Sequence, residues 1–104
     1  MRGQWYSHGW LVNGTTVYVG GPIKFDANEA QATIEVTVTQ GGSSVTGNSD
    51  PILASSTGWM SWAADLDGNA PFKPGKCEGS AKATIDKTDG TQTVLQWDNV
   101  VTLD

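Results

Sequence analysis

The sequence predicts an all-β fold, a single antiparallel β-sandwich of about seven short strands. Apolar and polar residues alternate with a period of two in several segments, which is the pattern of half-buried strands. Turn-forming pairs separate these segments at the roughly 8–12-residue spacing typical of sandwiches. Glycine and threonine together supply 25 of the 104 residues, and both types favour strands and turns over helices.

The clearest predicted strand covers residues 33–39. Ile34, Val36 and Val38 share one face of that strand, and the intervening threonines and Glu35 share the face exposed to water. Weaker alternation predicts strands at 10–12, 15–19, 58–66, 80–86, 91–97 and 100–103, with Asn99 separating the last two. The best helical candidate, 26–31, is long enough for one turn at most.

Two turns are predicted from residue type. Asn13-Gly14 is suited to a two-residue hairpin turn with positive φ at both positions, and Asp89-Gly90 is suited to a second turn. Connections this short favour antiparallel pairing, because parallel strands need long crossovers. We therefore expect one domain over 1–104, an Ig-like or jelly-roll-like sandwich, with a small β-barrel as the second choice.

Composition excludes several classes of function. The formal net charge is −5 and the lysines are scattered, so a nucleic acid or an anionic membrane is a poor partner. No apolar run approaches the ~20 residues of a membrane span. Cys77 is the only cysteine, which predicts a structural thiol and no intrachain disulfide. No segment resembles a signal peptide. Neutral threonine and serine on the outer faces favour a secreted or particle-surface protein over a cytoplasmic one.

Five tryptophans are more than a core of this size ordinarily holds. Trp62 and Trp97 share strand faces with other apolar residues and are predicted to be buried. Trp59 lies three residues before Trp62, so a regular strand points it the opposite way, toward solvent. Trp5 and Trp10 also have opposite parity, which predicts that one of them is exposed. The alternative is that all five tryptophans fill the core.

Exposed indoles predict a non-catalytic binding module, without cofactor or metal. The first hypothesis is carbohydrate binding, as in a lectin or carbohydrate-binding module, because an indole face attracts the C–H groups of a sugar ring. Trp59 and either Trp5 or Trp10 would stack on the sugar. Its hydroxyls would bind to three polar side chains, Asp65, Asp67 and Asn69. The alternative is a structural, assembly or adhesin Ig-like domain that contacts protein, including a possible homo-oligomer.

Catalysis and calcium binding receive less support. No nucleophile motif accompanies His8, the single histidine, and 104 residues leave little material for a catalytic cleft beside a core. The segment 65–69 offers three oxygen-bearing side chains but lacks the glycine and glutamate positions of an EF-hand loop. It reads first as a turn, and whether it binds calcium stays open.

Overall fold

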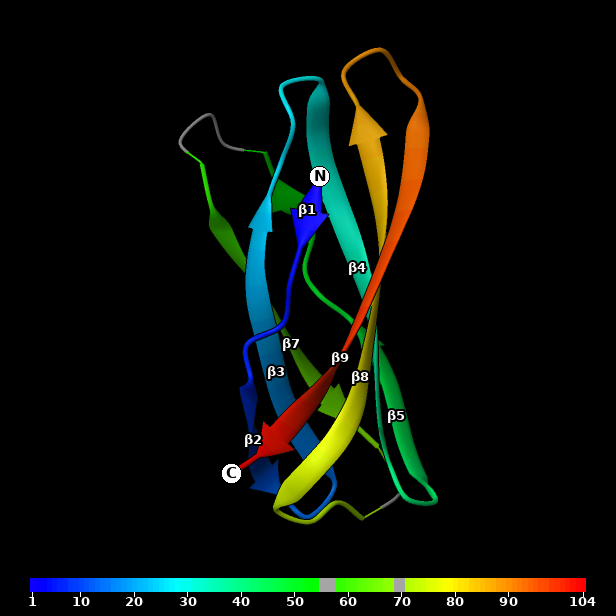
Figure 1. Ribbon diagram of the computed structural model, residues 1–104. Helices are drawn as coiled ribbons and strands as arrows, with labels where there is room; N and C mark the ends of the chain where they lie inside the picture. The colour runs from blue at the N-terminus through cyan, green and yellow to red at the C-terminus, as the bar shows by residue number, and fades with distance from the viewer. Residues whose placement is uncertain (55–57, 69–70) are drawn as a thin grey trace.

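The computed structural model describes residues 1–54, 58–68 and 71–104, which form nine strands and no helix (Figure 1). None of these residues therefore belongs to a helix that could cross a membrane. In chain order the strands are β1 (Arg2–Gly3), β2 (His8–Asn13), β3 (Thr16–Lys24), β4 (Glu29–Gln40), β5 (Ser43–Asn48), β6 (Ile52–Leu53), β7 (Met60–Asp67), β8 (Gly75–Lys87) and β9 (Gln92–Leu103).

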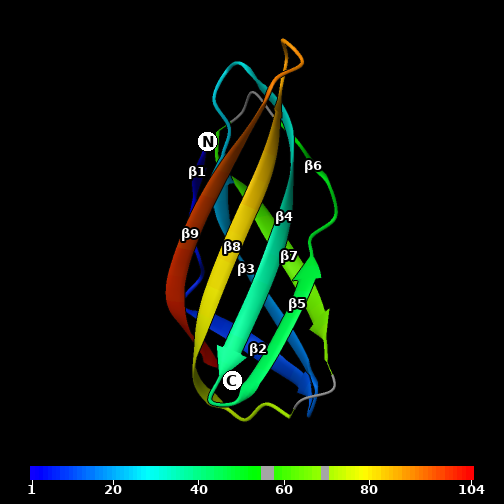
Figure 2. The same cartoon turned by 90° about the vertical axis from the view of Figure 1, so that its right-hand side faces the viewer.

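The strands form two layers with the core between them (Figure 2). In sheet A, β3 pairs with β7 on one side and with β1 and β2 on the other. In sheet B the order is β9-β8-β4-β5, and the short β6 also pairs with β4. The prediction of an all-β sandwich is confirmed.

The strand order resembles that of a variable-type immunoglobulin sandwich. Sheet B corresponds to strands G-F-C-C′, and sheet A to A-B-E. The expectation of purely antiparallel pairing was wrong at one place, because β2 runs parallel to β9 and joins the two sheets along one edge. Main-chain bonds extend this seam, from Thr102 N–H to Ser7 C=O and from Asp104 N–H to Gly9 C=O.

Alternation correctly predicted the inward faces of the long strands. Ile34, Val36 and Val38 on β4 are fully buried, as are the alternate residues Ala81 and Ala83 on β8. Trp62, Ala64 and Leu66 line the inner face of β7 in the same way. These residues, with Val17, Val19 and Ile23 of β3, form a core of small and branched side chains that needs large groups to fill it.

The expected hairpin turn at Asn13-Gly14 differs in detail. The two turn residues are Gly14 and Thr15, and neither has positive φ. The Asn13 side chain accounts for this, because its Oδ1 accepts hydrogen bonds from the backbone N–H groups of Thr15 (3.0 Å) and Thr16 (2.9 Å). Such a side-chain bond closes a turn without a left-handed residue.

Three other expectations about elements were wrong. β9 runs unbroken through Asn99, which pairs with Gly79, since the long partner β8 supplies hydrogen bonds along its whole length. The segment 26–31 is a tight turn followed by the start of β4, and Glu29 stabilises that turn by accepting the Asp26 N–H at 2.6 Å. The glycine- and serine-rich segment 41–44 predicts a flexible polar link, but its last two residues begin β5, which pairs with β4.

Three tryptophans fill the space between the sheets. Trp5 and Trp62 meet edge to face with ring centroids 4.9 Å apart, and Trp62 meets Trp97 at 6.2 Å. Trp5 donates its indole N–H to the Trp97 carbonyl (3.1 Å), and Trp62 donates to the Gln4 carbonyl (2.9 Å). These bonds tie the segment before β2 to both β7 and β9.

Glycines make room for these rings. A Cβ on Gly79 would lie 2.7 Å from Cη2 of Trp5, and a Cβ on Gly3 would lie 2.5 Å from Cε2 of Trp97. A Cβ on Gly21 would overlap the carbonyl of Gln4. The N-terminal segment can therefore enter the sandwich only where these positions lack side chains.

We expect Gly79→Ala to lower the free energy of unfolding by about 1–3 kcal/mol, because the added methyl overpacks the Trp5 seat. Gly14→Ala is the matched control, since a Cβ there meets nothing within 4 Å. Urea denaturation measures both. In a Trp5→Leu background, Gly79→Ala should lower the free energy of unfolding clearly less. Equal losses in the two backgrounds would contradict the close contact between Trp5 and Gly79.

Candidate functional site: the outer faces of the two sheets

The outer face of sheet A presents aromatic side chains. On β3, Val17 and Val19 point into the core, so Tyr18 points out. Trp10 of β2 lies directly opposite Tyr18, and Asp65 of β7 lies opposite Tyr18 on its other side. Trp10 is 54% exposed, and Tyr6 and Val12 are exposed as well. We call Tyr6, Trp10, Val12 and Tyr18 the aromatic face.

The rings of the aromatic face are ordered but do not form one plane. Trp10 and Tyr18 are 5.8 Å apart between centroids, with an angle of 48° between their planes. The hydroxyl groups of Tyr6 and Ser61 lie 3.0 Å apart, within hydrogen-bonding distance. At the rim, His8 Nδ1 lies 3.1 Å from a carboxylate oxygen of Asp104. The face is thus an apolar ridge bordered by polar groups.

The predicted sugar-binding residues are only partly brought together. Trp10, Asp65 and Asp67 share this face, and Asp67 accepts a hydrogen bond of 2.7 Å from the Thr16 hydroxyl. Trp59 is 48% exposed, as predicted, but it lies just before β7 and six residues before Asp65, roughly 20 Å away in extended chain. Trp59 and Trp10 therefore cannot stack on one sugar ring.

Trp5 is not available to a ligand, because it is only 7% exposed and its ring is packed against Trp62. Of the pair Trp5 and Trp10, parity correctly predicted that one is exposed. Trp62 is buried at 1% exposure as predicted, and Trp97 is half-buried. Asn69 lies outside the described residues.

A hollow opens beside Tyr18, between sheet A and the end of β5. Polar side chains of Asn48, Asp50 and Asp65 line it together with Tyr18 and the small residue Ala63. The hollow thus combines one aromatic ring with two carboxylates and an amide. Sequence reasoning found Asp65 but not its neighbours, because β5 was not recognised as a strand.

The outer face of sheet B is polar and rich in hydroxyl groups. Its outward residues stand in rows across four strands, and two such rows are Ser44–Thr39–Glu78–Val100 and Thr46–Thr37–Ser80–Asp98. The Thr37 and Thr46 hydroxyls lie 2.9 Å apart across the β4–β5 pair. Thr37 and Thr39 are outward threonines of β4, as the sequence predicted.

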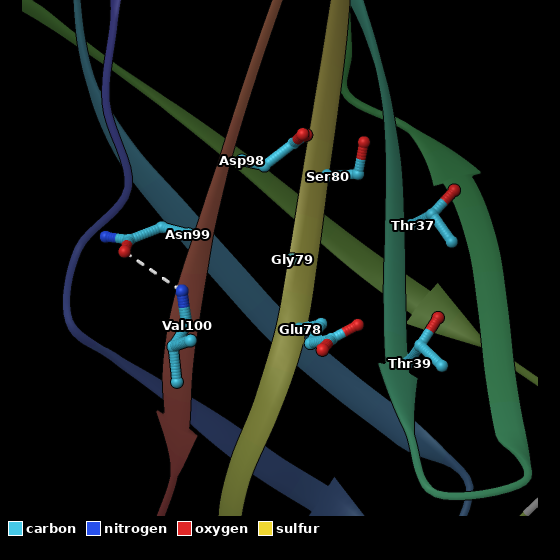
Figure 3. A pocket seen from close by; sticks show the side chains of 8 residues that line it. All are labelled: Thr37, Thr39, Glu78, Gly79, Ser80, Asp98, Asn99 and Val100. Carbon is cyan, nitrogen blue, oxygen red and sulfur yellow. Dashed lines mark hydrogen bonds between the residues drawn. The ribbon is translucent and has the colours of Figure 1, made fainter.

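A hollow of about 450 Å³ lies in the middle of this face (Figure 3). Short side chains of Thr37 and Ser80 form its floor, together with the backbone of Gly79 on β8. Glu78, Asp98 and the exposed side chain of Val100 surround them. Figure 3 shows Asn99 pointing away from this group, with its Oδ1 accepting the Val100 N–H at 2.9 Å. No sequence signal could have placed Glu78 beside Asp98, since that requires the register of β8 and β9.

Cysteine, histidine and carboxylate side chains are the groups with catalytic or metal-binding potential. Cys77 is buried, its Sγ lies 3.2 Å from the Val101 carbonyl, and burial raises the pKa of its thiol. A thiol with a raised pKa is a poor nucleophile. Within 1–54, 58–68 and 71–104, no group of three His, Cys, Asp or Glu side chains is placed to hold a metal ion. The 65–69 segment lies partly outside that range.

The fold and these faces define an all-β sandwich with one aromatic and one hydroxyl-rich outer surface. The sequence matches no family model and no curated protein. Among solved structures it is similar to murine CRIg, with 13% identity, a TM-score of 0.49, and coverage of 98% of this chain and 94% of that chain. At that level of similarity the fold description rests on the strand pairing itself.

Tryptophan fluorescence tests the placement of the indoles. We expect an aqueous quencher to reach Trp10 and Trp59 and to leave the other three protected, because those three are packed between the sheets. The variant Trp10→Phe/Trp59→Phe should lose nearly all quenchable emission. Light scattering on the same sample reports the mass. If the wild type is an oligomer in which Trp10 is protected, and a monomeric variant loses that protection, then Trp10 lies in a subunit contact instead.

Asp86 gives a pH-dependent test of the sheet B face. Its carboxylate accepts hydrogen bonds of 2.6 Å from Gln31 Nε2 and Gln92 Nε2, and these bonds lower the pKa of Asp86. A lowered folded-state pKa stabilises the fold above the ordinary aspartate value of about 3.9 and stops doing so as pH falls through the lowered value. The free energy of unfolding should therefore fall less in the Asp86→Asn variant than in the wild type when the pH is lowered from about 5 to about 2.

An NMR titration of the Asp86 carboxyl separates this cause from others. Gln92→Met removes one donor, so the pKa of Asp86 should move up toward its ordinary value. An unchanged pKa in that variant would show that the hydrogen bond from Gln92 does not form in solution.

Proposed function

We propose that the protein is a non-catalytic binding domain whose aromatic face contacts another protein. The observation that carries this proposal is the exposure of Trp10 directly beside Tyr18 on a sheet whose core is already filled by three other tryptophans. Large exposed aromatic groups rimmed by polar residues are typical of interaction surfaces. Trp and Tyr also contribute most of the binding energy where such surfaces meet a partner.

The shape of the aromatic face supports a protein partner over a sugar. A sugar ring stacks best on a flat indole face, and here the two neighbouring planes are tilted by 48°. A ridge of tilted rings with Val12 beside it matches an apolar pocket on a protein surface more closely. The many hydroxyl groups on the outer surface of sheet B support a secreted or particle-surface setting for such contacts.

Carbohydrate binding is the second candidate function. The hollow at Tyr18 favours it, because Asn48, Asp50 and Asp65 could take sugar hydroxyls beside the phenol ring. In that case the ligand would sit at the β5–β7 edge, and Trp59 would lie too far away to contribute.

Affinity capture tests the proposal. The immobilised protein is exposed to extracts and medium of the source organism, and retained proteins are identified by mass spectrometry. We expect a partner whose retention falls by about 30-fold or more with Trp10→Ser, as for a central aromatic contact worth about 2 kcal/mol. Val94→Ser, which removes an equally exposed apolar group from sheet B, is the matched control and should retain the partner.

A glycan array run with the same variants distinguishes the two candidates. The proposal would give way to carbohydrate binding on two results together. The wild type would bind a sugar that Asp65→Asn and Tyr18→Ala do not bind, and no protein would be retained in a Trp10-dependent way. Retention that is insensitive to Trp10 and sensitive to Val94 would move the interface to sheet B.

A further inference from the structure

The hollow on the outer face of sheet B contains two carboxylates that have no ion-pair partner among the described residues. Glu78 and Asp98 stand on neighbouring strands, diagonal to each other, because Glu78 pairs with Val100 and Asp98 pairs with Ser80. Neither forms a salt bridge within the described part of the chain. Asp98 accepts only a long contact of 3.4 Å from Gln96 Nε2.

The other acidic residues of this face have different neighbours. Glu35 lies directly opposite Lys82 in the β4–β8 register. Asp86 accepts short hydrogen bonds from Gln31 and Gln92. Two lysines of β8 also point outward. Lys76 is the outward residue before Glu78, and Lys82 is the outward residue after Ser80. Glu78 and Asp98 are therefore neighbouring carboxylates that have neither a lysine directly opposite nor short hydrogen bonds from side-chain amides.

The walls and floor of the hollow also have a definite chemical character. Val100 is 54% exposed and offers an apolar wall to one side of the carboxylates. Ser80 and Thr37 supply hydroxyl oxygens between them, and these short side chains leave the space open. Figure 3 shows the oxygens of Asp98, Ser80 and Thr37 directed to the same side of the sheet.

We propose that this hollow binds an arginine side chain presented by a partner protein. Diagonal residues on paired strands have Cα atoms roughly 7–8 Å apart, a gap that a guanidinium spans because it carries donors on opposite edges. A lysine ammonium is a compact point charge and engages one carboxylate at a time. The methylene stem of arginine packs along Val100. The site lies on the sheet opposite the aromatic face and does not depend on that face binding a partner.

A second copy of the chain is the other occupant to consider. The chain has one arginine, Arg2, exposed on β1. Both copies carry a net charge of −5, which opposes self-association. Complementarity of charge therefore favours a different, arginine-bearing protein.

The test is an NMR titration of the full chain with N-acetyl-arginine methylamide as the probe. We expect saturable shifts at the backbone amides of Glu78, Ser80 and Asp98. The citrulline analogue has the same shape without the charge and should give none, and the lysine analogue should bind more weakly. Glu78→Gln/Asp98→Asn should reduce the affinity at least about fivefold, whereas Glu35→Gln/Asp86→Asn, with the same change in charge, should leave it unaltered.

Three results would overturn the proposal. Equal shifts with citrulline would show that the guanidinium charge is not recognised, and equal losses in both double variants would show only a general response to a cation. Self-association that disappears in Arg2→Gln would identify a second copy as the occupant. Trp10→Ser should bind the probe like the wild type, so failure here is independent of failure at the aromatic face.

Discussion

The insertion of Trp5 between the two sheets is the contact on which the rest of the molecule depends. The ring meets Trp62 of sheet A, its indole N–H bonds to the Trp97 carbonyl of sheet B, and its far edge rests against Gly79. The core strands contribute mostly valine, alanine and isoleucine, which are too small to fill the space between two sheets unaided. One indole therefore supplies volume, a cross-sheet hydrogen bond and an anchor for the chain entering β2. The domain has no disulfide that could do this, since Cys77 on β8 is its only cysteine.

Filling the core with three tryptophans has a consequence for the surface. Trp10 and Trp59 are not needed for packing. Strand alternation points Trp10 outward because Leu11 points inward, and it points Trp59 outward because Trp62 points inward. Their exposure leaves apolar area in water, which opposes solubility unless another surface covers it. The argument for binding thus begins in the core, because the core determines which tryptophans remain outside.

Period-two alternation was a sufficient guide wherever a strand is buried on one face only. It placed Ile34, Trp62 and Ala81 inward and Trp59 outward, since a slip of one residue would have exposed a whole apolar set. It failed where the deciding contacts are distant in sequence. β5 has one buried large residue, Val45, and is a strand because β4 offers it a paired edge. Asn99 looked like a break until the length of β8 was known. The neighbours of Asp65 and the juxtaposition of Glu78 with Asp98 depend on register between strands, which composition and parity do not contain.

The parallel pairing of β2 with β9 determines which surfaces can meet a partner. It joins the two sheets along one edge, and strand edges are otherwise the simplest place for another chain to add. On the opposite side, Gly47 of β5 approaches Leu66 of β7 so closely that a Cβ would lie 2.8 Å from its Cδ2, which brings the two sheets together there as well. We therefore place the proposed contacts on the broad outer faces. Those faces differ in chemistry, aromatic on sheet A and hydroxyl-rich with free carboxylates on sheet B, so one small sandwich offers two surfaces that suit two different kinds of contact.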